Sequence, residues 1–223
     1  MDMKVVFPLA LLLVSAVQEQ DQAPAAKGAS LRQELLTMEK EDQQVRTAVL
    51  KALAERGVSP GDSKPITEPA VMKILLEQSG KMAAVDQKNR ERLKKIMDKH
   101  GWPGRSLVGQ DGAHAAWLLV QHADADLAFQ KGCLQAMKAL PKGEVEPQDI
   151  AYLTDRVLVA EKRKQVYGTQ LLQQGGKFIP QPIEDELSVD KRRAEVGLPP
   201  LAEYLKTAQA EYDKLSGEKS EKK

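Results

Sequence analysis

The sequence has few of the residues on which several functional classes depend. Aromatic residues make up 4% of its 223 positions, and Cys133 is the only cysteine. So few rings argue against base-stacking platforms for nucleic acids and against aromatic strips that bind carbohydrate. A single cysteine excludes an internal disulfide, so the core alone must hold the fold together. Cys133 lies among apolar residues in a helical pattern, which is typical of a core residue and not of an activated thiol.

Charge of one sign is also lacking. The 33 basic and 32 acidic side chains almost cancel and leave a formal net charge of +1. Recognition of nucleic acid needs a basic face, so we expect no nucleic-acid partner. Beyond the first residues, no apolar run approaches the length of a membrane-spanning helix. We therefore expect no integral membrane segment in the mature protein.

The first residues have the layout of a secretory signal peptide. Lys4 supplies a positive charge, residues 5–14 are apolar, and Ser15 and Ala16 are small residues that suit a cleavage site. The apolar run is too short for a stable membrane anchor. We therefore assign residues 1–16 to a signal peptide and residues 17–29 to a linker, and expect a secreted or periplasmic protein.

Helical periodicity dominates the rest of the chain. Apolar residues recur at helical spacing from Ser30, which with Gln33 is suited to a capping box. A second helix is expected from about Pro69, with a break at Gly80. A central helix, apolar around most of its circumference, is expected to begin near Asp111 and to be buried.

These patterns predict one domain. We assign residues 30–66 to an N-terminal helix and loop, residues 67–215 to an α-helical domain, and residues 216–223 to a disordered charged tail. Alternating and β-branched residues around a Gly-Gly pair predict a β-hairpin near residues 165–182. The predicted fold is mainly α, a single-domain antiparallel helical array with one small β-hairpin.

All three histidines lie within residues 100–122, and the last of them is the best candidate for a site. His100 falls in the last turn of a predicted helix, where the helix dipole favours a cation. His114 is expected to be partly exposed. His122 directly follows the apolar run 115–120, so an imidazole is placed where the chain is expected to be buried.

The segment from His122 to Asp126 has two interpretations. On a straight helix His122 and Asp126 share one face and Asp124 points elsewhere, but a turn after His122 would bring the three together. Imidazole and carboxylate ligands would then suit zinc, manganese or iron. In the stronger interpretation, Asp124 caps the next helix and His122 is a buried histidine held by a hydrogen bond. We predict no metal and no other cofactor.

Polar residues elsewhere could complete a pocket around His122. The Arg156 guanidinium could hold a carboxylate through a bidentate pair, or Asp155 and Arg156 could form an ion pair that joins helix to hairpin. In strand alternation the segment QVYGTQ places hydrogen-bonding side chains on one side, where they could orient a polar ligand or, in the slightly favoured interpretation, satisfy buried helix termini. The candidate ligand-binding residues are Asp126, Gln130, Asp155, Gln165, Tyr167, Thr169 and Gln170.

These residues belong to an ordered series of motifs. HGWPGRSLVG, GAHAAWLLVQHADADLAFQ, AYLTDRV, QVYGTQ and PIEDELSVDKRRAEVGLPPLAEY follow one another within residues 85–206. In these motifs the chain resembles a bacterial domain family of unknown function. The resemblance implies an α-rich domain, exported or intracellular, and carries no catalytic role over to any residue.

Two functional hypotheses follow. The first is an exported binding or interaction module, in which His122 and Asp155–Arg156 converge near Tyr167 around a small polar ligand or a protein partner. The second is a hydrolase, with or without a metal. There His122 acts as general base, Asp124 or Asp126 orients it, and Arg156 stabilises developing negative charge. Imidazole suits the role of base because its ordinary pKa lies near neutrality.

Overall fold

The computed structural model describes residues 26–55, 69–174 and 176–216. The predicted signal peptide, most of the predicted linker, the loop 56–68 and almost all of the predicted tail lie outside these residues. The described elements are α1 (Ala26–Ala54), α2 (Pro69–His100), α3 (Arg105–Gln121), α4 (Leu127–Ala139), α5 (Pro147–Ala160), β1 (Leu171–Gln174), β2 (Lys177–Pro180), α6 (Val189–Glu195) and α7 (Leu201–Ser216). The prediction of a mainly α fold with a small β-hairpin is confirmed.

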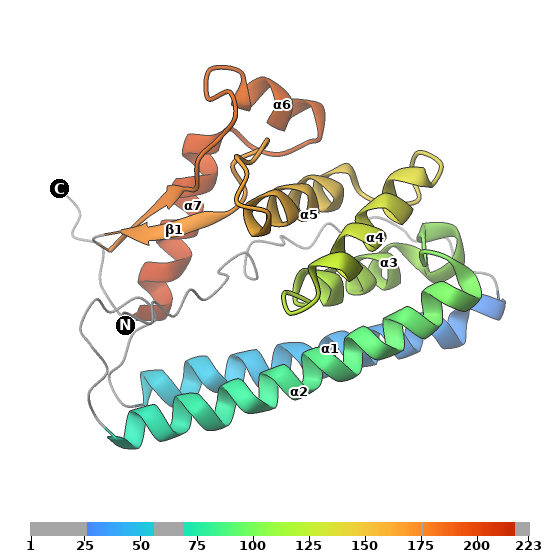
Figure 1. The fold of residues 1–223 in the computed structure, drawn as a ribbon, viewed down its shortest axis with the longest axis horizontal. Helices are drawn as coiled ribbons and strands as arrows, with labels where there is room; N and C mark the ends of the chain where they lie inside the picture. The colour runs from blue at the N-terminus through green and yellow to red at the C-terminus, as the bar shows by residue number, and fades with distance from the viewer. Residues whose placement is uncertain (1–25, 56–68, 175, 217–223) are drawn as a thin grey trace.

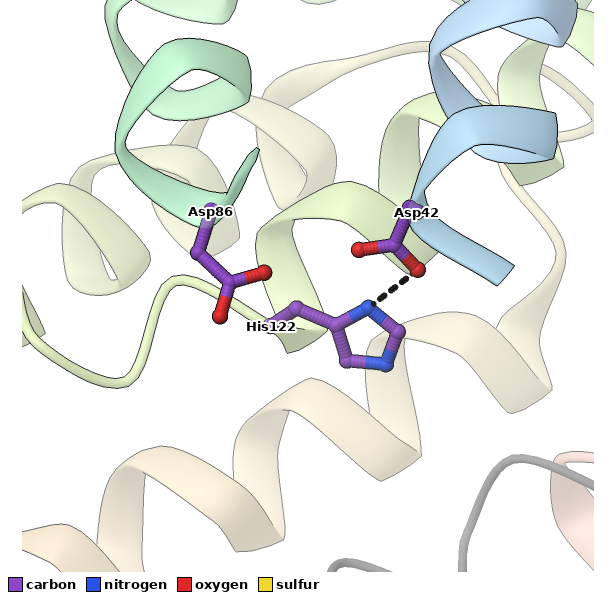
Figure 2. Close-up of side chains that lie close together, drawn as sticks. All are labelled: Asp42, Asp86 and His122. Carbon is purple, nitrogen blue, oxygen red and sulfur yellow. Dashed lines mark ion pairs between the residues drawn. The ribbon is translucent and has the colours of Figure 1, made fainter. Parts of the chain in front are cut away.

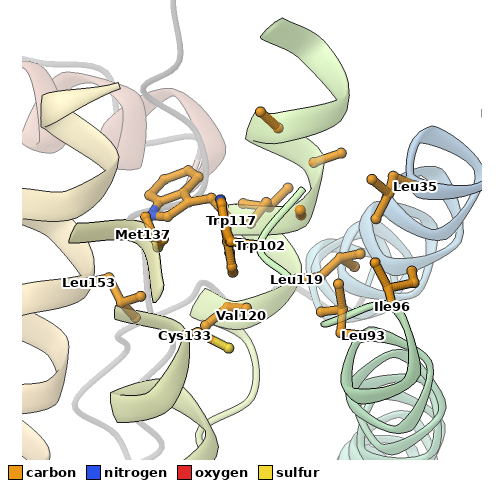
Figure 3. Packing of buried hydrophobic residues seen from close by; sticks show 14 of the residues in the cluster. Leu35, Leu93, Ile96, Trp102, Trp117, Leu119, Val120, Cys133, Met137 and Leu153 are labelled. Atoms are coloured by element: carbon orange, nitrogen blue, oxygen red, sulfur yellow. The ribbon is translucent and has the colours of Figure 1, made fainter. Parts of the chain in front are cut away.

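The helix α3 lies at the centre of the packing. Helices α1 and α2 form a long antiparallel pair along one side of the molecule, and α4 and α5 lie on the other side of α3 (Figure 1). Leu119 faces Leu35 of α1 and Leu93 of α2, whereas Val120 lies beside Cys133 of α4 (Figure 3). Neighbours on both sides explain why α3 is apolar around most of its circumference.

Several predicted helix boundaries were wrong. The first helix begins at Ala26, so Ser30 lies inside it and is not its cap. The second helix runs through Gly80 without a break, because one glycine costs only about 1 kcal/mol in a helix of 32 residues. The central helix α3 consists of two helical parts joined at Gly109, which has a non-helical conformation with φ 75° and ψ 171°. The part after Gly109 agrees with the start predicted near Asp111, whereas the first part, from Arg105, was not predicted.

The β-hairpin is shorter than its predicted range and rests on the last helix. Strands β1 and β2 pair antiparallel, with Leu171 opposite Pro180. Two strands alone are marginally stable, so they need a supporting surface. Helix α7 supplies it: Tyr212 packs edge-on against Phe178 with ring centroids 5.3 Å apart, and the Phe178 amide donates to Gln209 at 3.1 Å. Of the helices described, none is both long and apolar enough to cross a membrane.

The first turn of α1 lies directly against the start of α3. A Cβ atom placed on Gly28 would lie 1.6 Å from the carbonyl oxygen of Leu107, far inside van der Waals contact. Only glycine permits this backbone approach. The N-terminal helix is thus packed on the rest of the structure at its beginning as well as along its length.

We therefore expect Gly28→Ala to lower the free energy of unfolding by about 1–3 kcal/mol, the usual cost of overpacking. The matched control is Gly132→Ala in α4, where an added Cβ meets nothing within 4 Å. That change should raise stability by roughly 0.5–1 kcal/mol, because alanine loses less entropy in a helix. Urea unfolding followed by circular dichroism measures both, and equal effects of the two changes would contradict the close approach.

Candidate functional site

His122 terminates α3 and points between the two long helices. Its backbone N–H closes the last turn by donating to Leu118, and its side chain is 1% exposed. The ring atom Nδ1 lies 2.8 Å from Oδ2 of Asp42 on α1 (Figure 2). The predicted buried histidine held by a hydrogen bond is confirmed, and its partner is an aspartate outside the predicted candidates.

The contacts of Nδ1 define the tautomer of the His122 ring. Burial raises the pKa of Asp42, but the hydrogen bonds and charges of His122 and Arg46 outweigh burial, and the pKa is lowered. Asp42 is therefore an ionised acceptor, so Nδ1 must carry the proton between them. Arg46 Nε, 3.0 Å from Nδ1, donates instead to Asp42 Oδ2 at 3.2 Å. In the neutral ring, Nε2 then carries a lone pair.

Arg46 also links Asp42 to α2. Its Nη2 donates to Asp42 Oδ1 at 3.2 Å and to Asp86. Burial raises the pKa of Asp86 to about 6, and the charge of Arg46 opposes this shift. One guanidinium thus connects the buried carboxylate of Asp42 with the half-buried carboxylate of Asp86 on another helix, which reduces the cost of removing each from water.

Asp42, Asp86 and His122 are spaced as metal ligands can be. One possible ligand atom from each residue lies within 4.8 Å of the other two. Such a mixed set suits zinc, manganese or iron. However, the Arg46 guanidinium already contacts all three residues and supplies the positive charge that their carboxylates require. A metal ion would have to displace Arg46, so this donor set does not fit a resident metal.

A second polar group surrounds Arg156 of α5. Its Nε donates to Gln121 Oε1 at 2.8 Å, and its Nη1 donates to both oxygens of Asp124 at 3.1 and 3.2 Å. Gln130 donates to the same carboxylate at 3.1 Å. The Arg156 side chain is 9% exposed, whereas that of Asp124 is 54% exposed. The ion pair therefore joins a buried cation to a carboxylate at the surface.

Three adjacent buried side chains each keep one nitrogen without a hydrogen-bond partner among the described residues: His122 Nε2, Gln121 Nε2 and Arg156 Nη2. A buried polar atom left unpaired costs about 1–3 kcal/mol, so such atoms are rare. Figure 2 shows His122 Nε2 turned away from both aspartates. Burial lowers the pKa of His122, Asp42 opposes this effect, and the charges of Arg46 and Arg156 lower the pKa further. The neutral ring is therefore favoured.

Asp126, and not Asp124, is the N-cap of α4. Its Oδ1 accepts a hydrogen bond from the Phe129 amide at 3.0 Å, while its Oδ2 lies 2.8 Å from Lys94 Nζ. The chain makes a turn from Ala123 to Asp126 before the helix begins, which moves the cap two residues along. This turn leaves Asp124 free to pair with Arg156.

Asp155 and Arg156 are neighbours on α5 but contact different parts of the protein. The Asp155 carboxylate accepts from the backbone amides of Val166, Tyr167 and Thr169 and from the Thr169 hydroxyl, at 2.7–3.1 Å. Asp155 therefore joins α5 to the QVYGTQ segment through backbone amides and not through an ion pair. Burial raises its pKa, and these hydrogen bonds oppose the shift.

The QVYGTQ residues use their polar groups within the fold. The Gln165 side chain donates to Gln170 O and Gln181 O and accepts from the Gln170 amide. The Gln170 side chain donates to Thr169 Oγ1. The backbone carbonyl of Tyr167 accepts from Arg193, which is fully buried. These contacts hold the segment against α5 and α6, and a ligand-binding role for its residues stays a prediction.

Sequence reasoning missed Asp42, Arg46 and Asp86. A signal for Asp42 was present in the spacing of the apolar residues. Asp42 continues the stripe Leu31, Leu35, Met38 and precedes Val45 and Val49 in the same 3–4 spacing. A carboxylate in a buried stripe requires a partner, because acidic residues are almost never fully buried unpaired. The identity of that partner depends on how the helices pack.

Comparison with known proteins places the chain in a family. Residues 29–215 match the model described as "Family of unknown function (DUF6624)", so the chain belongs to this family. The expected membership of a family of unknown function is confirmed. The curated proteins and the solved structures that were searched contained no match.

His114 and His122 each lie beside an aspartate, but they should titrate in a fixed order. His114 lies 3.5 Å from Asp149; burial lowers its pKa, but this carboxylate outweighs burial and raises it. We therefore expect His114 to titrate above the ordinary value of 6.5 and His122 below it. NMR titration of the ring protons measures both, because the chain has three histidines.

The sign of the stability effect follows from the lowered pKa of His122. As the pH falls below 6.5, the unfolded state takes up a proton that folded His122 resists. His122→Gln should lower the free energy of unfolding, and the difference between wild type and variant should become smaller as the pH falls through this range. A difference that grows toward acid, or a His122 that titrates above His114, would contradict the assignment.

Proposed function

We propose that this domain binds a small ligand that carries an oxyanion, through Gln121, His122 and Arg156. The observation that carries the proposal is the set of three unpartnered nitrogens on these buried neighbours. Gln121 and His122 are consecutive, and Arg156 Nε donates to the side-chain oxygen Oε1 of Gln121 at 2.8 Å. One ligand group could therefore satisfy nitrogens whose isolation is otherwise costly.

The chemistry of the three nitrogens indicates the kind of ligand. Arg156 Nη2 and Gln121 Nε2 are donors, whereas Nε2 of the neutral His122 ring is an acceptor. Hydrogen phosphate offers both acceptor oxygens and a hydroxyl that can donate. Guanidinium groups bind phosphate and carboxylate oxygens strongly because the hydrogen bonds are charge-assisted. We therefore expect phosphate, or a ligand that carries a phosphate group.

Asp124 acts in this proposal as an internal competitor for the ligand. Its half-exposed carboxylate places both oxygens on Nη1 of Arg156 and leaves Nη2 unpaired. An incoming oxyanion would meet the same guanidinium from the side that Asp124 covers. Removal of the negative charge of Asp124 should therefore favour ligand binding.

The test is thermal unfolding with inorganic phosphate as the probe. Phosphate should raise the Tm of the wild type, raise that of Asp124→Asn further, and leave that of Arg156→Gln unchanged. Asp98→Asn, an exposed aspartate of α2, is the matched control and should respond like the wild type. Sulfate, which has no hydroxyl donor at neutral pH, should give a smaller shift. An equal phosphate shift in Arg156→Gln, or none in the wild type, would refute the proposal.

A hydrolase is a second candidate, favoured by one specific observation. Asp42 holds Nδ1 of His122 at 2.8 Å and leaves Nε2 unpartnered, which is the arrangement of an oriented general base. Asp42 would then replace Asp124 or Asp126 as the orienting residue. Hydrolysis of p-nitrophenyl phosphate that is lost in His122→Gln, with phosphate binding retained, would select this candidate. Binding without turnover would select the binding module.

Export is part of the proposal. It rests on residues 1–16, whose charge, apolar run and small residues match a signal peptide. We expect protein recovered from the native cell to begin after this segment and to lie outside the cytoplasm. Mass measurement of its N-terminal peptide and cell fractionation check this, and an intact N-terminus in the cytoplasmic fraction would contradict it.

A further inference from the structure

A cleft lies between α1 and α2, and His122 is not among the residues that line it. Its volume is about 510 Å³, within the range of small-molecule sites. The side chains that line it come from facing turns of the two helices. They include Glu34 and Glu41 of α1 and Lys88, Asn89 and Arg92 of α2.

Asn89 is the unusual residue of this cleft. It is the only asparagine in the sequence and is 1% exposed. Within the part of the chain that the structure describes, neither the oxygen nor the nitrogen of its side-chain amide has a hydrogen-bond partner. It also interrupts the apolar spacing of α2 between Met82 and Leu93. Leucine at this position would continue the stripe without leaving two polar atoms unpaired, so the amide calls for a partner.

Two ion pairs join residues that line the cleft from α1 and α2. Lys88 Nζ lies 2.7 Å from Glu41, and Arg92 makes a two-point contact with Glu34. All four side chains are at least 35% exposed. Exposed pairs of this kind contribute only about 0–1 kcal/mol, so they can exchange their partners for those of a ligand at little cost.

We propose that the cleft binds a short peptide, with one peptide group paired to the Asn89 amide. A carboxamide presents one donor edge and one acceptor, which are complementary to the C=O and N–H of a peptide group. The charged side chains of the cleft are complementary to the two ends of a free peptide. Lys88 and Arg92 can bind its terminal carboxylate, and Glu34 and Glu41 can bind its terminal ammonium group. None of the lining residues is aromatic, which disfavours a nucleobase or a sugar.

The first measurement locates the ligand. Protein labelled with ¹⁵N only in asparagine gives signals from a single residue, because Asn89 is unique. Titration with tri-alanine should shift both side-chain N–H signals of Asn89 and reach saturation. Absence of any change at millimolar tri-alanine would overturn the proposal.

The second measurement tests the role of the amide. Calorimetry should show that Asn89→Leu, which keeps the volume and removes the polar atoms, loses tri-alanine binding while its Tm stays equal to or above that of the wild type. The control is Gln173→Leu in β1, another buried amide nitrogen without a partner, which should bind as the wild type does. Binding retained in Asn89→Leu would overturn the proposal, as would equal loss in both variants.

Discussion

The fold depends on how one buried imidazole is satisfied at the end of α3. His122 is carried into the interior because α3 is covered on both sides, so its Nδ1 proton needs an acceptor there. Asp42 supplies the acceptor from α1, and Arg46 then neutralises Asp42 and reaches Asp86 on α2. This chain of contacts joins three helices at one point. It sets the position of the N-terminal helix pair against the core more specifically than apolar packing alone.

The same contacts determine which atoms remain available. Because Asp42 takes Nδ1, the ring presents Nε2 away from the aspartates (Figure 2). Arg156 is fixed by Gln121 and Asp124 through Nε and Nη1, which leaves Nη2. The polar side chains at the end of α3 therefore form a polar centre with two neighbouring groups. Asp42, Arg46 and Asp86 bind one another, whereas Gln121, His122 and Arg156 each keep a nitrogen that can still form a hydrogen bond. Buried ion pairs add little net stability, so we attribute to this centre a role in specifying geometry and presenting those atoms.

The fold class, the hairpin and the burial of His122 could be predicted from the sequence, because helical periodicity and the Gly-Gly pair of a turn are local signals. It did not allow the partner of His122 to be predicted, since Asp42 lies on a helix whose position relative to α3 is a tertiary property. Asp155 and Arg156 illustrate the same limit: adjacent residues were expected to share a pocket, yet helical geometry directs them to different neighbours. The polar interruptions of apolar stripes at Asp42, Asp86 and Asn89 were visible in the sequence, and each proves to be buried or half-buried in a polar setting.

The most direct test of the account is the protonation state of the His122 ring. Long-range ¹H–¹⁵N NMR correlates the ring protons with both imidazole nitrogens and distinguishes a protonated nitrogen from one with a lone pair. At neutral pH we expect a neutral His122 ring that is protonated at Nδ1 and unprotonated at Nε2, and Asp42→Asn should disturb this preference. A ring protonated at Nε2 alone would contradict the Asp42–His122 interaction on which the rest depends, and a fully charged ring would contradict the lone pair at Nε2.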